Sequence, residues 1–426
     1  MRRLSLLIAF SMLVVAAVAQ CVPPQTKPRI IVSTDIGGTD PDDNQSMTHL
    51  LMYSDLLDIE GLVSTASYGN GSKEEILRMI DVYEADYEKL KSHAPGLMRP
   101  DALRALCKQG CRGAAPVEGY GEPTEGSRWI AECARRPGER PLWILVWGGL
   151  EDVAQALHDA PDIKNNIRVY WIGGPNKKWS VNAYTYIAAN HPDLWMIENN
   201  STYCGFFTDK GLTGDYGTGY YDYAIRGAGH LGADFIDYYG GRVKMGDSPS
   251  LFYMLDGDPE NPEKDCRGGR FVKTDRSTRH IYDRQLTVTD TVETYSVVEI
   301  RMSGPEQPWS AGTPCLTLTV DKQDWEGYYM GSGRYMVRYS PKAPAVLDYV
   351  ITSDIEGISG SGTFNIITGW PGKPTADDYQ TGDNWFTDCP DASLYEGGCW
   401  QGAKTQSRWR EDILRHWAER WAWLRQ

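Results

Sequence analysis

The chain lacks the long basic runs that are typical of proteins that bind nucleic acid. Its 426 residues include 43 Lys or Arg and 57 Asp or Glu, so the net charge is −14 at pH 7. Binding to phosphate backbones and to anionic membranes depends on clustered Lys and Arg. The composition therefore excludes nucleic acid as a partner and disfavours an anionic membrane surface.

Long hydrophobic runs are also missing, apart from one at the start of the chain. Arg2 and Arg3 precede an apolar run over residues 4–19, which ends in the small-x-small pattern Ala-Val-Ala. A run this short, with these flanks, is typical of a secretory signal peptide. We therefore expect residues 1–19 to be a signal peptide and the mature protein to be secreted or periplasmic.

Histidine is scarce, with seven residues scattered along the chain, and this disfavours a zinc site. The nine cysteines are more informative, because an oxidising compartment permits disulfides. The spacing makes Cys107–Cys111 and Cys389–Cys399 plausible bridges. Cys21 raises the alternative of a lipid anchor, but Gln20 stands before it where a small residue is expected.

Strand and helix patterns alternate over the first half of the chain. Helical periodicity covers 45–54 and 73–91, and short apolar runs predict buried strands at 28–35, 59–67, 142–147, 167–172 and 194–197. Strands that alternate with helices predict an α/β fold with a mostly parallel, open sheet and helices on both faces. In such sheets the ligand lies beyond the carboxyl ends of the strands.

The pattern changes near residue 275. Residues 281–370 are rich in Thr, Val, Tyr and Ser, with stretches of period two, which predicts a smaller all-β, sandwich-like module. A connector rich in Pro, Gly and Asp follows. In the last segment, 384–426, apolar residues recur every three or four positions, which predicts a final helix packed on the core.

The densest polar cluster comes directly after the first predicted strand. Its four carboxylates lie within nine residues, at Asp35, Asp40, Asp42 and Asp43. Two unit charges about 4 Å apart repel by roughly 4 kcal/mol near a protein surface. A hard divalent cation with oxygen ligands would relieve this repulsion. The alternative is a solvated turn, since Asp-Pro and Gly-Gly are common turn sequences.

Three further positions follow predicted strands or open a helix. Asp247 stands far along the chain and could cap the next helix, Asn70 could be a turn residue, and Trp147 precedes two glycines. The predicted topology places them at the same edge of the sheet as the acidic cluster. This agreement favours one site over three unrelated turns.

In this order the motifs resemble those of the calcium-dependent nucleoside hydrolases. They are a strand followed by Asp and later Asp-Asp, then Ser-Tyr-Gly-Asn, Val-Trp-Gly-Gly-Leu-Glu-Asp, Trp-Ile-Gly-Gly and a late Asp. More closely, the chain resembles a secreted branch, the cellulose-binding-protein-like group with a nucleoside-hydrolase-like domain. The resemblance implies that 26–275 and 384–426 form one domain and that 281–370 is an insertion.

The resemblance also implies a Ca²⁺ site and a catalytic base. The implied calcium ligands are the carboxylates of Asp35, Asp43 and Asp247 and the carbonyl of Trp147, with Asp40 or Asp42 as alternatives for the second acidic position. Asp35 would take a proton from a calcium-bound water, which attacks the anomeric carbon of an oxocarbenium-like transition state. The candidates for binding sugar hydroxyls are Asn70, Asn182 and Glu198.

The chain departs from the family pattern at two points. It has Ser33-Thr34-Asp35 where the family has Asp-x-Asp, and its first loop is longer. Gly246 stands before Asp247, where many nucleoside hydrolases have a His that protonates the leaving base. His230 and Glu198 are the remaining candidates for this acid.

Three functions follow from these observations. The first is a calcium-dependent hydrolase of glycosidic bonds, acting on a nucleoside-like molecule or a saccharide. The second is a carbohydrate-binding protein that keeps the fold without catalysis, for which the many Tyr and Trp and the β module are suited. A phosphatase of the Asp-x-Asp-Gly-Thr type is disfavoured, because Gly37 stands where the second Asp is needed. The sequence leaves open whether the protein is a homo-oligomer.

Overall fold

The centre of the molecule is a mostly parallel sheet. The computed structural model describes residues 26–207 and 213–425, and in these residues the sheet has eight strands in the order β3-β2-β1-β4-β5-β6-β18-β7. Only β7 runs antiparallel to its neighbour. The strands are β1 (Arg29–Thr34), β2 (Asp58–Ser64), β3 (Cys107–Gln109), β4 (Leu142–Val146), β5 (Ile167–Ile172), β6 (Trp195–Asn199), β7 (Phe271–Lys273) and β18 (Trp385–Asp388).

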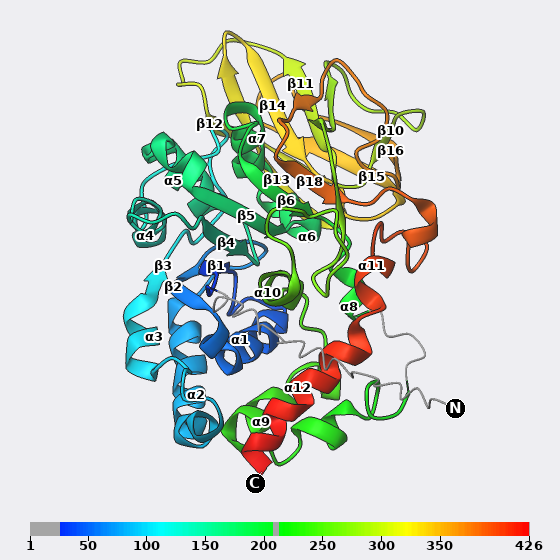
Figure 1. The fold of residues 1–426 in the computed structure, drawn as a ribbon. Coiled ribbons are helices and arrows are strands. Elements are labelled where there is room, and N and C mark those ends of the chain that lie inside the picture. The colour runs from blue at the N-terminus through cyan, green and yellow to red at the C-terminus, as the bar shows by residue number, and fades with distance from the viewer. Residues whose placement is uncertain (1–25, 208–212, 426) are drawn as a thin grey trace, which may run out of the picture.

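Helices cover both faces of this sheet, as the sequence predicts (Figure 1). Because side chains alternate along a strand, Ile30 and Val32 pack on one face and Ile31 on the other. The first face is covered by α1 (Asp42–Met52), α2 (Lys73–His93), α9 (Gly229–Ile236), α10 (Ser248–Asp256) and α12 (Arg410–Arg425). The second is covered by α4 (Glu125–Ala134), α5 (Glu151–Asp159) and α7 (Val181–Asn190). Shorter helices are α3 (Pro100–Leu106), α6 (Gly174–Trp179), α8 (Cys204–Phe207) and α11 (Lys404–Ser407).

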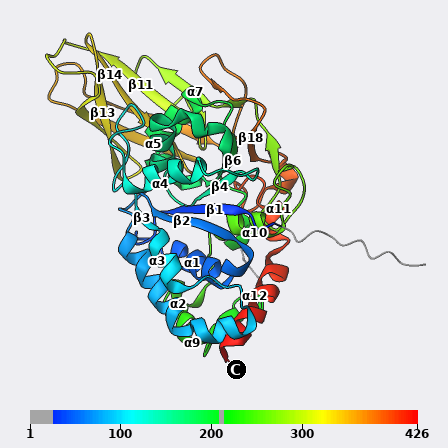
Figure 2. The same cartoon turned by 60° about the vertical axis from the view of Figure 1, so that its left-hand side comes forward.

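The predicted all-β module is a second sheet with its own core. All of its residues are described, and its eight strands are mostly antiparallel, in the order β10-β16-β15-β12-β13-β14-β11-β9. They are β9 (Arg279–Tyr282), β10 (Thr291–Glu293), β11 (Val297–Ser303), β12 (Thr313–Val320), β13 (Gln323–Gly331), β14 (Arg334–Tyr339), β15 (Ala345–Thr352) and β16 (Gly360–Ile367). Figures 1 and 2 show this module on the side of the parallel sheet opposite α2, α9 and α12.

The chain leaves the parallel sheet through β7 and returns to it through β18, which pairs with β6 and β7. The short strands β8 (Arg276–Ser277) and β17 (Tyr379–Gln380) pair beside these two crossings. The chain then ends in α12, whose apolar stripe is buried against the core at Ile413, Leu414, Trp417, Trp421 and Leu424.

The expected disulfides are not formed. Within the described residues, Cys107, Cys111 and Cys389 carry free thiols. Cys107 begins β3, and the extended backbone that follows carries Cys111 into the next loop, away from the Cys107 thiol. Close spacing in the sequence was therefore not sufficient to predict a disulfide.

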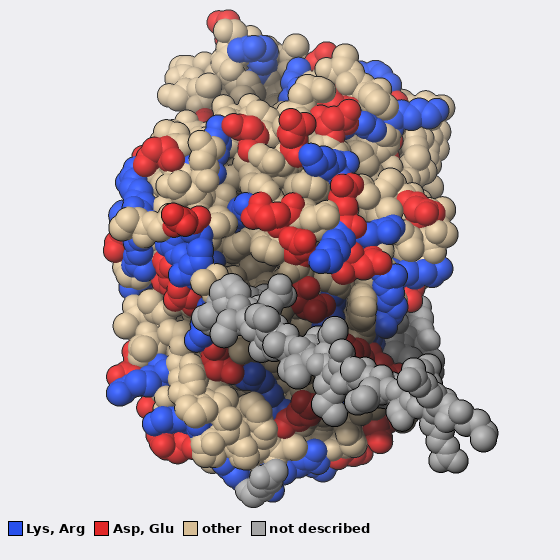
Figure 3. Space-filling model, viewed as in Figure 1, with Lys and Arg blue, Asp and Glu red and all other residues tan. Residues whose placement is uncertain are grey.

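The predicted signal peptide and Cys21 lie outside the described residues. In the part of the chain that is described, no helix combines the length and the apolar character needed to cross a membrane. On the face drawn in Figure 3, acidic and basic side chains are interspersed.

Candidate metal centre and active site

Three buried carboxylates from distant parts of the chain meet at the carboxyl end of β1. Asp42 and Asp43 are the first two residues of α1, and Asp247 directly precedes α10. One carboxylate oxygen from each lies within 4.8 Å of the others. Their exposed fractions are 9%, 3% and 3%, so water hardly screens their repulsion. We refer to Asp42, Asp43 and Asp247 as the Asp triad.

The electrostatics of the Asp triad favour a bound cation. Burial, together with the charge of Asp247, raises the pKa of Asp43 well above its usual value, and burial together with Asp42 does the same to the pKa of Asp247. One oxygen of Asp247, Oδ2, is buried and has no hydrogen-bond partner among the described residues. A buried oxygen of this kind is costly unless it binds something.

The donor set fits a hard divalent cation such as Ca²⁺, which prefers oxygen ligands. The Asp247 side chain forms no capping hydrogen bond to the described part of α10. The alternative role for Asp247, as a simple helix cap, is therefore wrong. Asp43 is positioned by Thr34, whose hydroxyl donates to its carboxylate.

Asp35 lies beside the Asp triad and is only half-buried. The carboxyl group of Asp43 and the hydroxyl of Ser67 lie within hydrogen-bonding reach of its carboxylate. Burial raises the pKa of Asp35 to about 6, although these two neighbours oppose the rise. Gly148 permits this position, because a Cβ there would stand 2.8 Å from the Cβ of Asp35.

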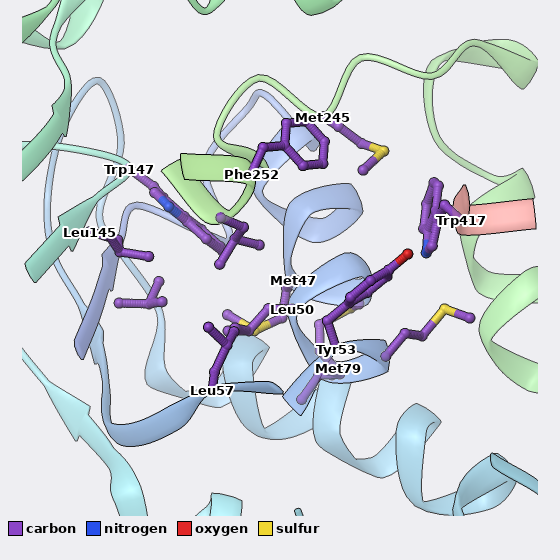
Figure 4. Close-up of a cluster of buried hydrophobic side chains, with 14 of the residues drawn as sticks. Met47, Leu50, Tyr53, Leu57, Met79, Leu145, Trp147, Met245, Phe252 and Trp417 are labelled. Atoms are coloured by element: carbon purple, nitrogen blue, oxygen red, sulfur yellow. The ribbon is translucent and has the colours of Figure 1, made fainter. Parts of the chain in front are cut away.

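Trp147 anchors the site to the core beneath it. Its backbone N–H donates to the carbonyl of Ser33 (2.7 Å), and its indole donates to Ser250 (2.8 Å), which in turn donates to the backbone carbonyl of Asp247 (2.7 Å). Figure 4 shows the Trp147 side chain in the buried cluster with Phe252. The Trp147 carbonyl accepts a hydrogen bond from Asn176 (3.3 Å), whose side chain also contacts Ser67.

Lys244 also belongs to the site, although no sequence motif predicts it. Its ammonium group is paired with the exposed Asp40 and lies 3.3 Å from Asp42. Although burial opposes it, the two carboxylates raise the pKa of Lys244. The signal was present, since Lys244 lies only three residues before Asp247, but a lone Lys gives no pattern to search for.

Gly246 leaves room for the Asp42 carboxylate. A Cβ at residue 246 would stand 2.2 Å from Oδ2 of Asp42. Any side chain at this position would therefore displace a member of the Asp triad. The local geometry therefore requires glycine at position 246, which is the position where the histidine is missing.

The structure separates the three candidate sugar-binding residues. Asn70 is exposed in the loop between β2 and α2. Asn182 faces the β module, and its side-chain oxygen accepts a hydrogen bond from Arg338 of that module (3.1 Å). Its amide donates to the carbonyl of Ala115 (3.1 Å), which belongs to the α/β domain. Asn70 is therefore free to meet a ligand from solution, whereas Asn182 is held between the two sheets.

Glu198 is not placed to bind sugar or to donate a proton. It is fully buried, at 0% exposure, and pairs with the equally buried Lys177. Tyr184 (2.9 Å) and Trp385 (3.0 Å) also donate to its carboxylate. The prediction for Glu198 is therefore wrong, because a saturated internal ion pair holds this side chain away from any ligand.

His230 is also wrongly placed for the leaving-group acid. It pairs with Asp86 at 3.0 Å, on α2. At about 1.5 Å per residue, Asp86 lies about 20 Å along α2 from the loop that carries Asn70. His230 therefore does not take the place of the histidine that is missing at Gly246.

Comparisons with known proteins bear on the family and on the fold. The family model described as "Cellulose-binding Sde182, nucleoside hydrolase-like domain" matches residues 29–271. A solved nucleoside hydrolase-related hypothetical protein from Saccharophagus degradans, associated with carbohydrate metabolism, is 20% identical and covers 80% of this chain and 100% of its own, with a TM-score of 0.50. The family model confirms the resemblance seen in the motifs, and the solved structure confirms the fold.

Two nucleoside hydrolases overlap less well. The inosine-uridine preferring enzyme from Bacillus anthracis is 17% identical and covers 53% of this chain and 82% of its own, with a TM-score of 0.34. A plant nucleoside hydrolase is 15% identical and covers 58% and 81%, with a TM-score of 0.36. No curated protein matches the chain.

Proposed function

The chain belongs to the family described as cellulose-binding Sde182, nucleoside hydrolase-like domain, and from this premise we propose that it is a calcium-dependent hydrolase of glycosidic bonds in nucleoside-like or saccharide substrates. The observation that carries the proposal is the Asp triad with its unpartnered Asp247 oxygen. Burying three carboxylates together is costly, and a cation-dependent site explains why the fold accepts this cost.

The residues of this chain would divide the work as follows. The Asp triad, Asp35 and the carbonyl of Trp147 would hold Ca²⁺, which when bound lowers the pKa of water. Asp35 would accept the proton of the attacking water, since its carboxylate lies beside the Asp triad and is only half-buried. Ser67 would orient Asp35, and Asn70 would contact a sugar hydroxyl from the neighbouring loop.

Two further predictions belong to this proposal. The first is that 281–370 is an insertion into a single domain formed by 26–275 and 384–426, which the return of β18 between β6 and β7 supports. The second is export through a signal peptide over residues 1–19, which fits a protein whose substrate lies outside the cell.

Sugar release measured with and without calcium tests the proposed activity. We expect intact protein to release reducing sugar or free base in Ca²⁺, EDTA to abolish the release, and Asp35→Asn to do the same in Ca²⁺. The matched control is Asp101→Asn, because Asp101 is an exposed carboxylate on α3. If Asp35→Asn retains full activity, Asp35 is not the base and the proposed mechanism is wrong.

A second candidate function is carbohydrate binding without catalysis. Two observations favour it: Gly246 has no side chain that could act as a leaving-group acid, and Lys244 already pairs with Asp42. In this case the protein would bind a polysaccharide such as cellulose, and no bond would be cut with or without calcium.

A further inference from the structure

A cleft joins the β module to the α/β domain next to Asp35. Its volume is about 200 Å³. From the α/β domain it is lined by Ser67, Ala114, Trp179, Val181 and Asn182, and from the module by Asp324, Trp325, Glu326, Tyr328 and Arg338. We refer to these ten residues as the interdomain cleft.

The interdomain cleft and the candidate active site meet at Ser67. Ser67 lines the cleft and is also within hydrogen-bonding reach of the Asp35 carboxylate. The Ser67 hydroxyl is further held by Asn176 at 2.6 Å. A ligand whose reacting bond lies at Asp35 would therefore extend into the cleft on the far side of Ser67.

An aromatic pair stands at the rim of the cleft. The rings of Tyr68 and Trp179 are 5.0 Å apart, and Tyr68 is 55% exposed. Exposed aromatic rings offer flat, apolar surfaces that suit the C–H face of a sugar ring. Trp179 is partly buried, and an aromatic pair that is partly open to solvent, beside a cleft lined by apolar and polar residues, is typical of a ligand site.

The charge in the cleft favours a neutral ligand. Asp324 and Glu326 are exposed carboxylates, whereas Arg338 is mostly buried and already bound to Glu299 (3.1 Å) and Asn182. Among the ten cleft residues, an anionic ligand would meet two negative charges and only the positive charge of Arg338, which is already engaged; the ammonium group of Lys342 lies outside this set, 5.7 Å from the centre of the Trp179 ring. Carboxylates that accept hydrogen bonds suit the hydroxyl groups of an uncharged sugar.

The walls of the cleft are held in place before any ligand arrives. Lys178 pairs with Asp321 at 2.8 Å, and the indole of Trp325 donates to the carbonyl of Lys178 (3.3 Å). Arg338 donates to the carbonyl of Val117 (2.8 Å) on the other side. A preformed cleft loses little freedom on binding, which favours affinity.

We propose that the interdomain cleft is a binding subsite for a neutral oligosaccharide, whose chain runs from Asp35 over the Tyr68–Trp179 pair to the β module. The inference rests on the proposed function, because it takes the reacting end of the ligand to lie at Asp35. It gives the β module a role, namely to supply one wall of the substrate site and thus a preference for longer chains.

The test measures the binding of cellobiose and cellohexaose by calorimetry, in Ca²⁺ and in the Asp35→Asn background so that nothing is cut. We expect Trp179→Ala to weaken cellohexaose binding at least tenfold and Glu326→Gln, an exposed and conservative change, to weaken it severalfold. Cellobiose binding should change less. Trp309→Ala is the matched control, because Trp309 is a 41% exposed tryptophan of the module outside the cleft.

The outcomes separate the two proposals. If Trp179→Ala and Glu326→Gln bind cellohexaose like the parent, or if the parent does not bind it, the cleft proposal is overturned. If binding falls as expected but the intact protein cuts no substrate, the cleft stands and the hydrolase proposal fails. Circular dichroism of each variant shows whether a loss reflects misfolding, and Glu326→Gln then decides the outcome.

Discussion

Asp35→Asn should stabilise the protein in the absence of calcium and lose that advantage in its presence. Without metal, the folded protein must bury the Asp35 carboxylate beside the Asp triad, which raises its pKa from 3.8 to about 6. At about 1.4 kcal/mol per unit, keeping this group charged at pH 7.5 costs up to about 3 kcal/mol of folding free energy. Asn has the same shape and no charge, so the variant recovers part of this cost.

Calcium should reverse the sign. A cation bound by the Asp triad attracts Asp35, so that the carboxylate then stabilises the folded state and its removal weakens calcium binding. The measurement is the free energy of unfolding in urea at pH 7.5, followed by tryptophan fluorescence, in EDTA and in millimolar Ca²⁺. Asp101→Asn should leave the values unchanged in both buffers, because Asp101 lies on the surface.

A uniform effect of Asp35→Asn would contradict a role for the charge of this residue. If Asp35→Asn destabilises the protein equally in EDTA and in Ca²⁺, Asp35 contributes through ordinary hydrogen bonds and not through the charge of the site. If neither the parent nor the variant responds to Ca²⁺, the Asp triad does not bind this ion.

Three further predictions concern the surroundings of the site. In EDTA, the free energy of unfolding should fall as pH rises from about 4 to about 7, because burial raises the pKa of Asp42 to about 7 and the folded state keeps protons that the unfolded chain has released. Urea unfolding at each pH measures this dependence, and Ca²⁺ should make it weaker. Gly246→Ala should weaken calcium binding tenfold or more in titration calorimetry, whereas Gly113→Ala, with open space around residue 113, should not. Lys177→Met should lower the free energy of unfolding in urea by about 3–5 kcal/mol, because it leaves the buried Glu198 unpaired. Adding Glu198→Gln should restore part of this loss, and equal stability of the single and double variants would contradict an ion pair.

Local patterns were sufficient to predict the parallel sheet and the edge at which acidic side chains meet. Apolar runs fix the strands, and parallel strands bring their carboxyl ends to one edge, so Asp43 and Asp247 could be expected to meet although about 200 residues separate them. The all-β module was equally visible, because period-two sequences differ from helical ones whatever their partners are.

Features that depend on distant partners were beyond this reasoning. Glu198 follows the pattern of a ligand-binding residue at a strand end, yet Trp385, 187 residues later, closes over it. Lys244 carries no motif, and its pairing with Asp40 depends on how two loops meet. In both cases the partners of the side chain come from an element elsewhere in the chain, which the local sequence does not reveal.

The balance of charge at the site bears on both candidate functions. Asp35, Asp40 and the Asp triad carry five negative charges when ionised, against the single positive charge of Lys244. Lys244 therefore cannot neutralise the cluster, and the remaining charge must be met by protons or by a cation even in a protein that cuts no bond. A stabilising effect of calcium is thus expected whether or not the protein cuts a bond, and only loss of turnover on Asp35→Asn, with calcium still bound, would show that the same charge also performs catalysis.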